Sequence, residues 1–288
     1  MSPKDHLHRF TFDQSPARGE IVQLSNSYKA VLEKHSYPLP VQQLLGEFLA
    51  AAALLSATLK FEGILTLQVK GDGPLSMLMA ECRDQALLRA IATYEDKISA
   101  DESIFGNAQL AITIEPNKGQ SYQGIVAFEE GNLGQAIEGY FLRSEQLPTR
   151  IWLAADAQMQ TSAGLLLQAM PETPDQPQLG ESSEDWSRIE MLSETVTDAE
   201  LLTVEPETLL FRLYHEENAR LYPASELAFG CSCSRDRVAN SLLTLGKEET
   251  AAALAASGDE IEVDCHFCHT KYAFTKRDIT ALFESHVH

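Results

Sequence analysis

Four cysteines, which read Cys231-Ser232-Cys233 and then Cys265-His266-Phe267-Cys268, decide how the C-terminal part of this 288-residue chain folds. Another 31 residues separate the two pairs. Two close pairs of thiols on separate turns can build a tetrahedral four-sulfur zinc site, because each pair supplies one chelating corner. We therefore expect Cys231, Cys233, Cys265 and Cys268 to hold one zinc ion per chain.

Two other interpretations of these cysteines are two plain disulfides and covalent haem attachment. Residues 1–30 contain several charged side chains and no apolar export segment, so we expect a reducing, cytoplasmic setting that disfavours permanent disulfides. Cys265-His266-Phe267-Cys268-His269 matches the haem motif C-x-x-C-H, but haem would leave the first cysteine pair unexplained. Four cysteines already fill a tetrahedral shell, so we expect His266 and His269 to be solvated.

The net charge of −20 is concentrated in the middle of the chain. Residues 171–230 carry 3 basic and 14 acidic side chains, whereas residues 231–288 carry 6 and 9. This balance disfavours nucleic-acid phosphate and anionic membranes as partners. The longest apolar run, residues 48–55, is too short to span a bilayer.

Residues 1–170 are predicted to form an α+β domain with sheets rich in antiparallel pairing and with packed helices. Apolar spacing predicts a core helix over residues 41–59 and another helix over 132–146. Two hairpins are expected, one with Leu65, Leu67, Val69, Leu75, Met77 and Met79 on its apolar faces, the other over residues 110–128. Strands are expected near 151–155 and 165–170. No nucleotide-binding, zinc-protease or serine-hydrolase motif is present, so we do not expect an enzyme.

Residues 171–230 are predicted to be an acidic, helical, metastable linker. The prolines within 171–179 indicate a connection, and helical periodicity follows over 183–218 with a capping box at Thr197 and Glu200 and with Pro206 in a first turn. Such short, like-charged helices are stable only while docked. Apolar residues of these helices are candidates for exposure to other proteins: Trp186, Ile189, Leu192, Leu201, Leu202, Leu209, Leu210 and Leu213.

Residues 231–288 are predicted to be a small zinc-binding module with a helix capped by Ser234, a helix over 247–256, a strand pair around the second cysteine pair and a last helix capped by Thr275 and Asp278. Few apolar residues serve this module, so metal binding must supply much of its folding free energy. The lone Cys82 is expected to be a small buried residue.

Zinc-bound thiolates are also the form of cysteine that oxidants attack. Disulfides that close short loops stabilise little, so they cannot replace a cross-link across 31 residues. Oxidation is therefore expected to melt the module, to deprive the linker helices of their packing and to expose apolar faces suited to unfolded chains.

The chain resembles the 33-kilodalton family of redox-regulated heat-shock chaperones (chaperonins) along nearly its whole length. The four-cysteine pattern behind an acidic linker is the specific part. Weaker motifs occur in the right order: Arg18-Gly19-Glu20, Leu59-Lys60-Phe61, Gly71-Asp72-Gly73-Pro74, Tyr122-Gln123-Gly124, Tyr140-Phe141, Ser144 to Thr149, Leu165 to Gln168 and Leu213 to Glu217.

The resemblance implies a cytoplasmic, ATP-independent holdase that is inactive while it is reduced and zinc-bound. Peroxide or hypochlorous acid would form disulfides matching Cys231–Cys233 and Cys265–Cys268, after which the linker loosens and a homodimer binds unfolding or oxidatively damaged clients. Two alternatives are a thiol-disulfide oxidoreductase that uses Cys265 and Cys268, and a zinc-ribbon nucleic-acid module. The sequence context lacks a βαβ unit for the first and a basic face for the second.

Overall fold

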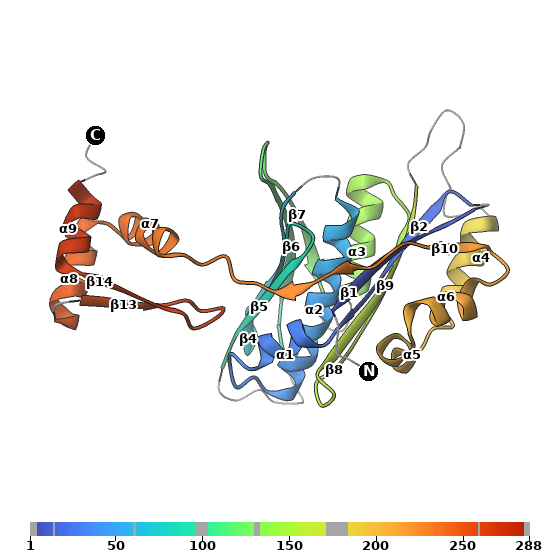
Figure 1. The fold of residues 1–288 in the computed structure, drawn as a ribbon, viewed down its shortest axis with the longest axis horizontal. Coiled ribbons are helices and arrows are strands. Elements are labelled where there is room, and N and C mark those ends of the chain that lie inside the picture. Colours follow the sequence, from blue (N-terminus) through green and yellow to red (C-terminus); the bar gives the residue numbers. More distant parts are fainter. Residues whose placement is uncertain are drawn as a thin grey trace. The chain divides into compact units, whose positions relative to one another are not determined.

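The computed structural model describes residues 5–13, 15–59, 62–95, 103–129, 133–170, 184–258 and 260–284. The chain is of the α+β class and divides into two compact units, Met1–Gly230 and Cys231–His288. Figure 1 shows sheets and helices in both units.

The first sheet of the N-terminal unit has the strand order β10-β1-β2-β9-β8, with β11 also paired to β1. All of its pairings are antiparallel. Its strands are β1 (His6–Phe12), β2 (Ala17–Leu24), β8 (Thr149–Asp156), β9 (Thr161–Ala169), β10 (Ala219–Leu221) and β11 (Ser225–Glu226). The strands predicted near 151–155 and 165–170 are confirmed as β8 and β9.

The second sheet has the order β12-β5-β4-β3-β6-β7. Only the short β12 pairs in parallel, with β5. The strands are β3 (Gly63–Gly71), β4 (Leu75–Arg83), β5 (Leu87–Tyr94), β6 (Ala108–Pro116), β7 (Tyr122–Phe128) and β12 (Ala228–Phe229). Both predicted hairpins are confirmed, as β3–β4 and β6–β7.

The predicted inward face of β4 is wrong beyond its first residue. The register shifts between Leu75 and Met77 in the pairing with β5. Such a bulge inserts an extra residue and changes which side chains face the core. Leu75 is buried as expected, but Leu78 and Ala80 then take the core positions and Met77 and Met79 are only half-buried.

Helix α2 (Leu39–Thr58) lies at the centre of the N-terminal unit and contacts strands of both sheets (Figure 1). It confirms the helix predicted over 41–59. Among the described residues, α2 is the one helix that is long and apolar enough to cross a membrane. However, 67% of its most apolar 18-residue stretch is buried inside this unit. Leu45, Phe48 and Leu49 are fully buried, as befits a core helix.

Among its described residues before residue 171, the N-terminal unit contains two other helical segments. Helix α1 (Asn26–Leu32) precedes α2. Helix α3 (Leu133–Tyr140) continues as a π-helical turn, η1 (Phe141–Glu145), and ends at Gln146 in the left-handed conformation. Together α3 and η1 account for the helix predicted over 132–146.

The helices predicted over 183–218 are α4 (Glu184–Ser193), α5 (Asp198–Thr203) and α6 (Pro206–Tyr214). The capping box of Thr197 and Glu200 forms, and Pro206 occupies the first turn of α6. The proline-rich connection predicted over 171–179 lies outside the described residues.

The C-terminal unit contains α7 (Arg235–Leu245), α8 (Lys247–Ser257), the antiparallel pair β13 (Glu260–Asp264) and β14 (Lys271–Thr275), and α9 (Lys276–Glu284). Ser234 caps α7 by accepting a hydrogen bond from the backbone N–H of Arg237. Thr275 and Asp278 cap α9 reciprocally, as predicted.

Candidate metal centre

The four predicted sulfur atoms form one cluster in the C-terminal unit. The Sγ atoms of Cys231, Cys233, Cys265 and Cys268 all lie within 4.8 Å of one another. The contacts across the two pairs are short, 3.6 Å from Cys231 to Cys265 and 3.4 Å from Cys233 to Cys268. Four sulfurs at ~2.3 Å from one zinc ion are separated by about 3.8 Å, so the cluster has the size and donor chemistry of a zinc–thiolate site.

Local structure places each corner of the cluster. Cys231 and Cys233 lie in the extended segment before α7, and Cys265 and Cys268 lie in the turn between β13 and β14. This turn is held by two backbone hydrogen bonds, from the N–H of Cys265 to the carbonyl of Thr270 (3.0 Å) and from the N–H of His269 to the carbonyl of Cys265 (2.8 Å). The second corner is therefore fixed by the strand pair itself.

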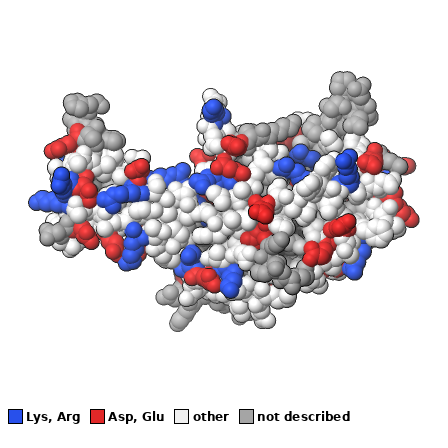
Figure 2. All heavy atoms as spheres, in the orientation of Figure 1, with Lys and Arg blue, Asp and Glu red and all other residues white. Residues whose placement is uncertain are grey.

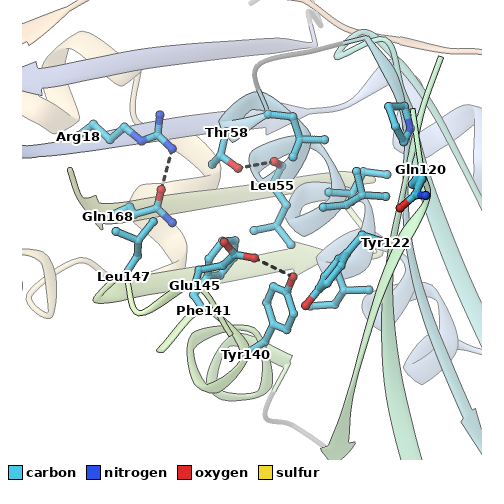
Figure 3. Close-up of a pocket in the computed structure, with 15 residues that line it drawn as sticks. Arg18, Leu55, Thr58, Gln120, Tyr122, Tyr140, Phe141, Glu145, Leu147 and Gln168 are labelled. Atoms are coloured by element: carbon cyan, nitrogen blue, oxygen red, sulfur yellow. Dashed lines mark hydrogen bonds between the residues drawn. The ribbon is translucent and has the colours of Figure 1, made fainter. Parts of the chain in front are cut away.

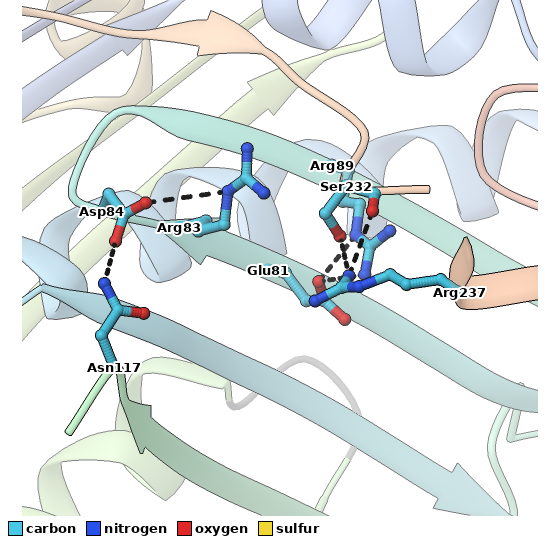
Figure 4. A network of polar contacts seen from close by, with 7 residues as sticks. All are labelled: Glu81, Arg83, Asp84, Arg89, Asn117, Ser232 and Arg237. Atoms are coloured by element: carbon cyan, nitrogen blue, oxygen red, sulfur yellow. Dashed lines mark hydrogen bonds and ion pairs between the residues drawn. The ribbon is translucent and has the colours of Figure 1, made fainter. Parts of the chain in front are cut away.

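Polar neighbours orient the sulfurs. The hydroxyl of Tyr272 donates a hydrogen bond to Sγ of Cys233 over 3.1 Å, and the hydroxyl of Thr270 lies 3.2 Å from Sγ of Cys268. Figure 4 shows the guanidinium of Arg237 donating hydrogen bonds to Ser232, the residue between the first two cysteines. Partners of this kind around a metal ligand fix its orientation and tune its affinity.

The four thiols of the cluster are not equivalent. Burial raises the pKa of the Cys265 thiol to about 12, against backbone hydrogen bonds that favour its thiolate. Burial also acts to raise the pKa of Cys268, but hydrogen bonds with Thr270, Cys233 and Cys265 together outweigh it and lower that pKa to about 6. Cys268 therefore carries thiolate character at neutral pH, as a metal ligand requires.

The apolar core around this cluster is small. Its buried members in the described part of the unit are Leu242, Leu254, Ile261, Phe274 and Ile279. Arg235 adds a cation–π contact, 4.3 Å from the centre of the Phe274 ring, and donates a hydrogen bond to the carbonyl of Ala273. A core of this size gives little stability by itself, so a cross-link at the four cysteines matters to folding.

The remaining candidate ligands lie elsewhere. His266 and His269 are exposed and do not belong to the four-sulfur cluster. Cys82 is fully buried in the core of the N-terminal unit, and burial raises the pKa of its thiol to about 11. A protonated, buried thiol of this kind is unreactive.

The predicted apolar residues of the linker helices pack on the first sheet. They are buried or half-buried in one cluster with sheet residues such as Phe10, Ile21 and Leu165. The buried members from the prediction are Trp186, Ile189, Leu201, Leu209, Leu210 and Leu213, and the half-buried ones are Leu192 and Leu202. Their packing partners therefore belong to the N-terminal unit, so melting of the C-terminal unit does not by itself remove these partners.

Ion pairs also hold α4 on this unit. Arg150 of β8 donates to Glu138 of α3 over 2.9 Å and to Glu190 of α4 over 2.6 Å. Glu217, which follows α6, accepts from Arg188 over 2.6 Å. These ion pairs fix the orientation of α4, whose apolar side chains pack on the first sheet.

Sequence reasoning missed an apolar pocket in the N-terminal unit (Figure 3). It has a volume of about 540 Å³ and is lined mainly by side chains of α2, β3, β6 and η1. Several lining residues come from the weak motifs scattered along the sequence: Arg18, Leu59, Tyr122, Tyr140, Glu145 and Gln168. Arg18 donates to Gln168 over 2.7 Å at one side of this pocket. The motifs were recognisable, but their convergence depends on long-range pairing.

Charges are interspersed on the face that Figure 2 shows, where lysine and arginine side chains lie among aspartates and glutamates. That face carries no extended basic patch among the described residues, and the whole chain has 42 acidic against 22 basic side chains.

Comparisons with known proteins agree over nearly the whole chain. The family model described as Hsp33 protein matches residues 5–275. The chain is 49% identical to the 33 kDa chaperonin of Ectopseudomonas mendocina over 97% of its own length and 95% of that protein, and 45% identical to that of Pseudomonas aeruginosa over 98% and 96%. The crystal structure of the 33 kDa chaperonin from Thermotoga maritima shares the fold, with a TM-score of 0.80, 22% identity and 98% and 99% coverage. The chain therefore belongs to the Hsp33 protein family.

Proposed function

We propose that this chain is a redox-regulated, ATP-independent chaperone (holdase) that binds unfolding proteins and prevents their aggregation. Membership of a family whose relatives are named chaperonins supports the chaperone role. The observation that carries the redox regulation is the four-sulfur cluster, which joins two distant segments of a unit with a small core. In the reduced, inactive state Cys231, Cys233, Cys265 and Cys268 hold one zinc ion per chain, and the metal supplies the cross-link that keeps residues 231–288 folded.

Activation is the oxidation of these thiols to disulfides Cys231–Cys233 and Cys265–Cys268, with loss of the metal. Each disulfide forms from two thiols, which give up two electrons and two protons, while one hydrogen peroxide molecule takes them up and becomes two waters. Each new S–S bond closes a loop of a few residues, so it stabilises the unit far less than the cross-link it replaces. All four sulfurs lie within 4.8 Å of one another, so pairing within or across the two motifs is within reach, and the cross-pair contacts of 3.6 Å and 3.4 Å make the pairing itself a point to test.

The loosened segment 171–230 then exposes apolar residues, and the active form is a homodimer in the cytoplasm. The acidic balance of the chain supports proteins rather than nucleic acid or membrane lipid as partners. The activity needs no catalytic residue, in agreement with relatives that are named chaperonins.

The direct test is aggregation of a heat-unfolded client protein, followed by light scattering in the presence of the reduced and of the peroxide-treated chain. Suppression only after oxidation supports the proposal. Equal suppression in both states removes the redox switch, and fast catalytic reduction of a disulfide substrate would favour the oxidoreductase alternative.

A further inference from the structure

Residues 219–230, here called the strap, join the last linker helix to the first cysteine and border both sheets of the N-terminal unit. Its strands β10 and β11 pair with β1 of the first sheet, and β12 pairs with β5 of the second. Gly230, the last residue of the strap, precedes the metal-ligand candidate Cys231 directly in the chain. The strap is therefore the covalent connection through which the state of the C-terminal unit reaches the two sheet edges.

The strap is held mainly by its backbone. The N–H groups of Ala228 and Gly230 donate to the carbonyls of Ala86 and Leu88 at the edge of the second sheet, both over 2.9 Å. The N–H of Leu227 donates to the carbonyl of Asp5, also over 2.9 Å. Backbone bonds of this kind accept any extended sequence without proline at the donor positions.

Side chains of the strap give it one apolar anchor. Leu227 is 7% exposed and belongs to the main hydrophobic core, whereas residues 222–226 and Ala228 are exposed. Phe229 is half-buried against that core, with the Lys34 ammonium 5.6 Å from its ring centre. A Cβ on Gly230 would come within 2.9 Å of Leu87, so the chain passes close to β5 there. A short apolar segment with alternate residues turned inward is thus seated on a sheet edge.

We propose that the strap occupies a strand-acceptor edge on β5, which takes up an extended apolar segment of an unfolded protein when the strap leaves. This inference rests on the proposed function and adds the binding mode. The incoming segment pairs in parallel with Leu87 and Leu88, donates to the carbonyls of Ala86 and Leu88, and places an apolar side chain where Leu227 lay. Binding of this type is strand addition, in which backbone bonds give affinity and alternate side chains give preference. An unfolded chain offers both free backbone N–H groups and exposed apolar side chains, whereas a folded protein has already paired or buried most of them.

The test uses the full-length chain and a fluorescent peptide with the strap sequence of residues 222–230, followed by anisotropy. In the reduced, zinc-loaded protein the tethered strap outcompetes the peptide, because its effective concentration is high. The peptide should therefore bind the oxidised protein at least tenfold more tightly. A peptide methylated at the nitrogen of Ala228 should lose that binding, whereas the same peptide methylated at Phe229, whose N–H points away from β5 in the strand alternation, should keep it.

A matched pair of variants tests the same edge within the protein. Leu227→Asp places a carboxylate in the apolar anchor and should allow the reduced protein to bind the peptide, whereas Ala228→Asp adds the same charge at an exposed position and should not. Equal binding of the two methylated peptides would overturn strand addition. Strand addition would also be overturned if the oxidised protein suppresses aggregation but does not bind the unmodified peptide. If oxidation gives peptide binding that depends on the Ala228 N–H but no suppression of aggregation, the acceptor edge stands and the proposed function fails. The peptide measurements on the unsubstituted protein decide the matter even if Leu227→Asp fails to fold.

Discussion

The sulfur of Cys233 lies 3.4 Å from that of Cys268, 35 positions further along the chain. No covalent bond joins them, and only a small apolar core surrounds them. A cross-link at the four sulfur atoms would therefore stabilise the C-terminal unit, and the strap is the segment of chain that leads from this cluster to the N-terminal unit.

Replacement of one ligand should unfold the C-terminal unit alone. We expect Cys268→Ser to abolish tight zinc binding and to expose the amides of residues 231–284, because the metal supplies folding free energy on the order of 10 kcal/mol in sites of this type. Hydrogen exchange with mass spectrometry and metal analysis measure both effects. Cys82→Ala, a change at a buried thiol of the N-terminal unit, is the control that keeps the metal. A zinc-loaded, protected unit in Cys268→Ser would rule out the four-sulfur site.

The hydroxyl of Tyr272 should moderate the reactivity of the cluster. Tyr272→Phe removes the hydrogen bond to Sγ of Cys233 and leaves the ring in place. We expect zinc affinity to fall by about 10-fold, within the range for loss of a group that hydrogen-bonds to a metal ligand, and thiol oxidation by peroxide to become faster. Tyr222→Phe removes a hydroxyl that contacts Thr11 instead, so the zinc affinity and the oxidation rate should both stay unchanged. Identical zinc affinity and oxidation kinetics in the two variants would show that the contact has no such role.

The docking of α4 should limit basal activity. Ile189 is fully buried in the cluster of linker helices and first sheet, so Ile189→Ala should cost roughly 2–4 kcal/mol and expose the sheet face in part of the population. We expect measurable suppression of aggregation by the reduced variant. The matched control is Met191→Ala on the same helix, where the side chain is 61% exposed. Loss of stability without any gain in suppression would mean that this face does not bind clients.

The stability contributed by Glu47 of α2 should depend on pH. Burial, together with the charge of Asp198 at the start of α5, raises the pKa of Glu47 to about 7. In the unfolded chain the pKa returns to about 4.5. The folded state therefore binds the extra proton between these values, and the stabilisation present at pH 4 is lost as the pH rises through 7.

Glu47→Gln removes the proton-linked part of the stability that this side chain contributes. Its free energy of unfolding should exceed that of the unsubstituted protein by on the order of 1–2 kcal/mol at pH 8, and the difference should disappear near pH 4. Urea unfolding at several pH values measures it, with Glu33→Gln, a change at an exposed glutamate that lies 3.9 Å from the Lys29 ammonium, as the control. A difference that is independent of pH would contradict the raised pKa.

The sequence predicted best where a local rule decides the structure. Thiol spacing identified the cysteine cluster, apolar spacing identified α2, and the capping residue Thr197 marked the start of α5. It failed where long-range pairing decides. The bulge after Leu75 in the pairing with β5 reversed the expected inward face of β4, and no local pattern shows a bulge.

The strap was missed for a related reason. Its strands contain two or three residues each, too few for an alternating pattern, and they exist because β1 and β5 offer free edges. Strands β1 and β5 themselves were also not predicted from the sequence. The apolar partners of α4 to α6 lie on the first sheet and not in the C-terminal unit. If melting of the C-terminal unit is to loosen these helices, it therefore has to do so through the strap.

The most direct test of the redox switch measures zinc content and free thiols before and after mild peroxide treatment, beside light scattering of a heat-unfolding client. Peptide mapping of the oxidised protein should place disulfides at Cys231–Cys233 and Cys265–Cys268. The redox switch predicts that one zinc per chain is lost together with four free thiols and that scattering is suppressed only afterwards. Zinc that is retained during activation, or lost without any gain in client protection, would contradict it and leave the cluster as a structural cross-link.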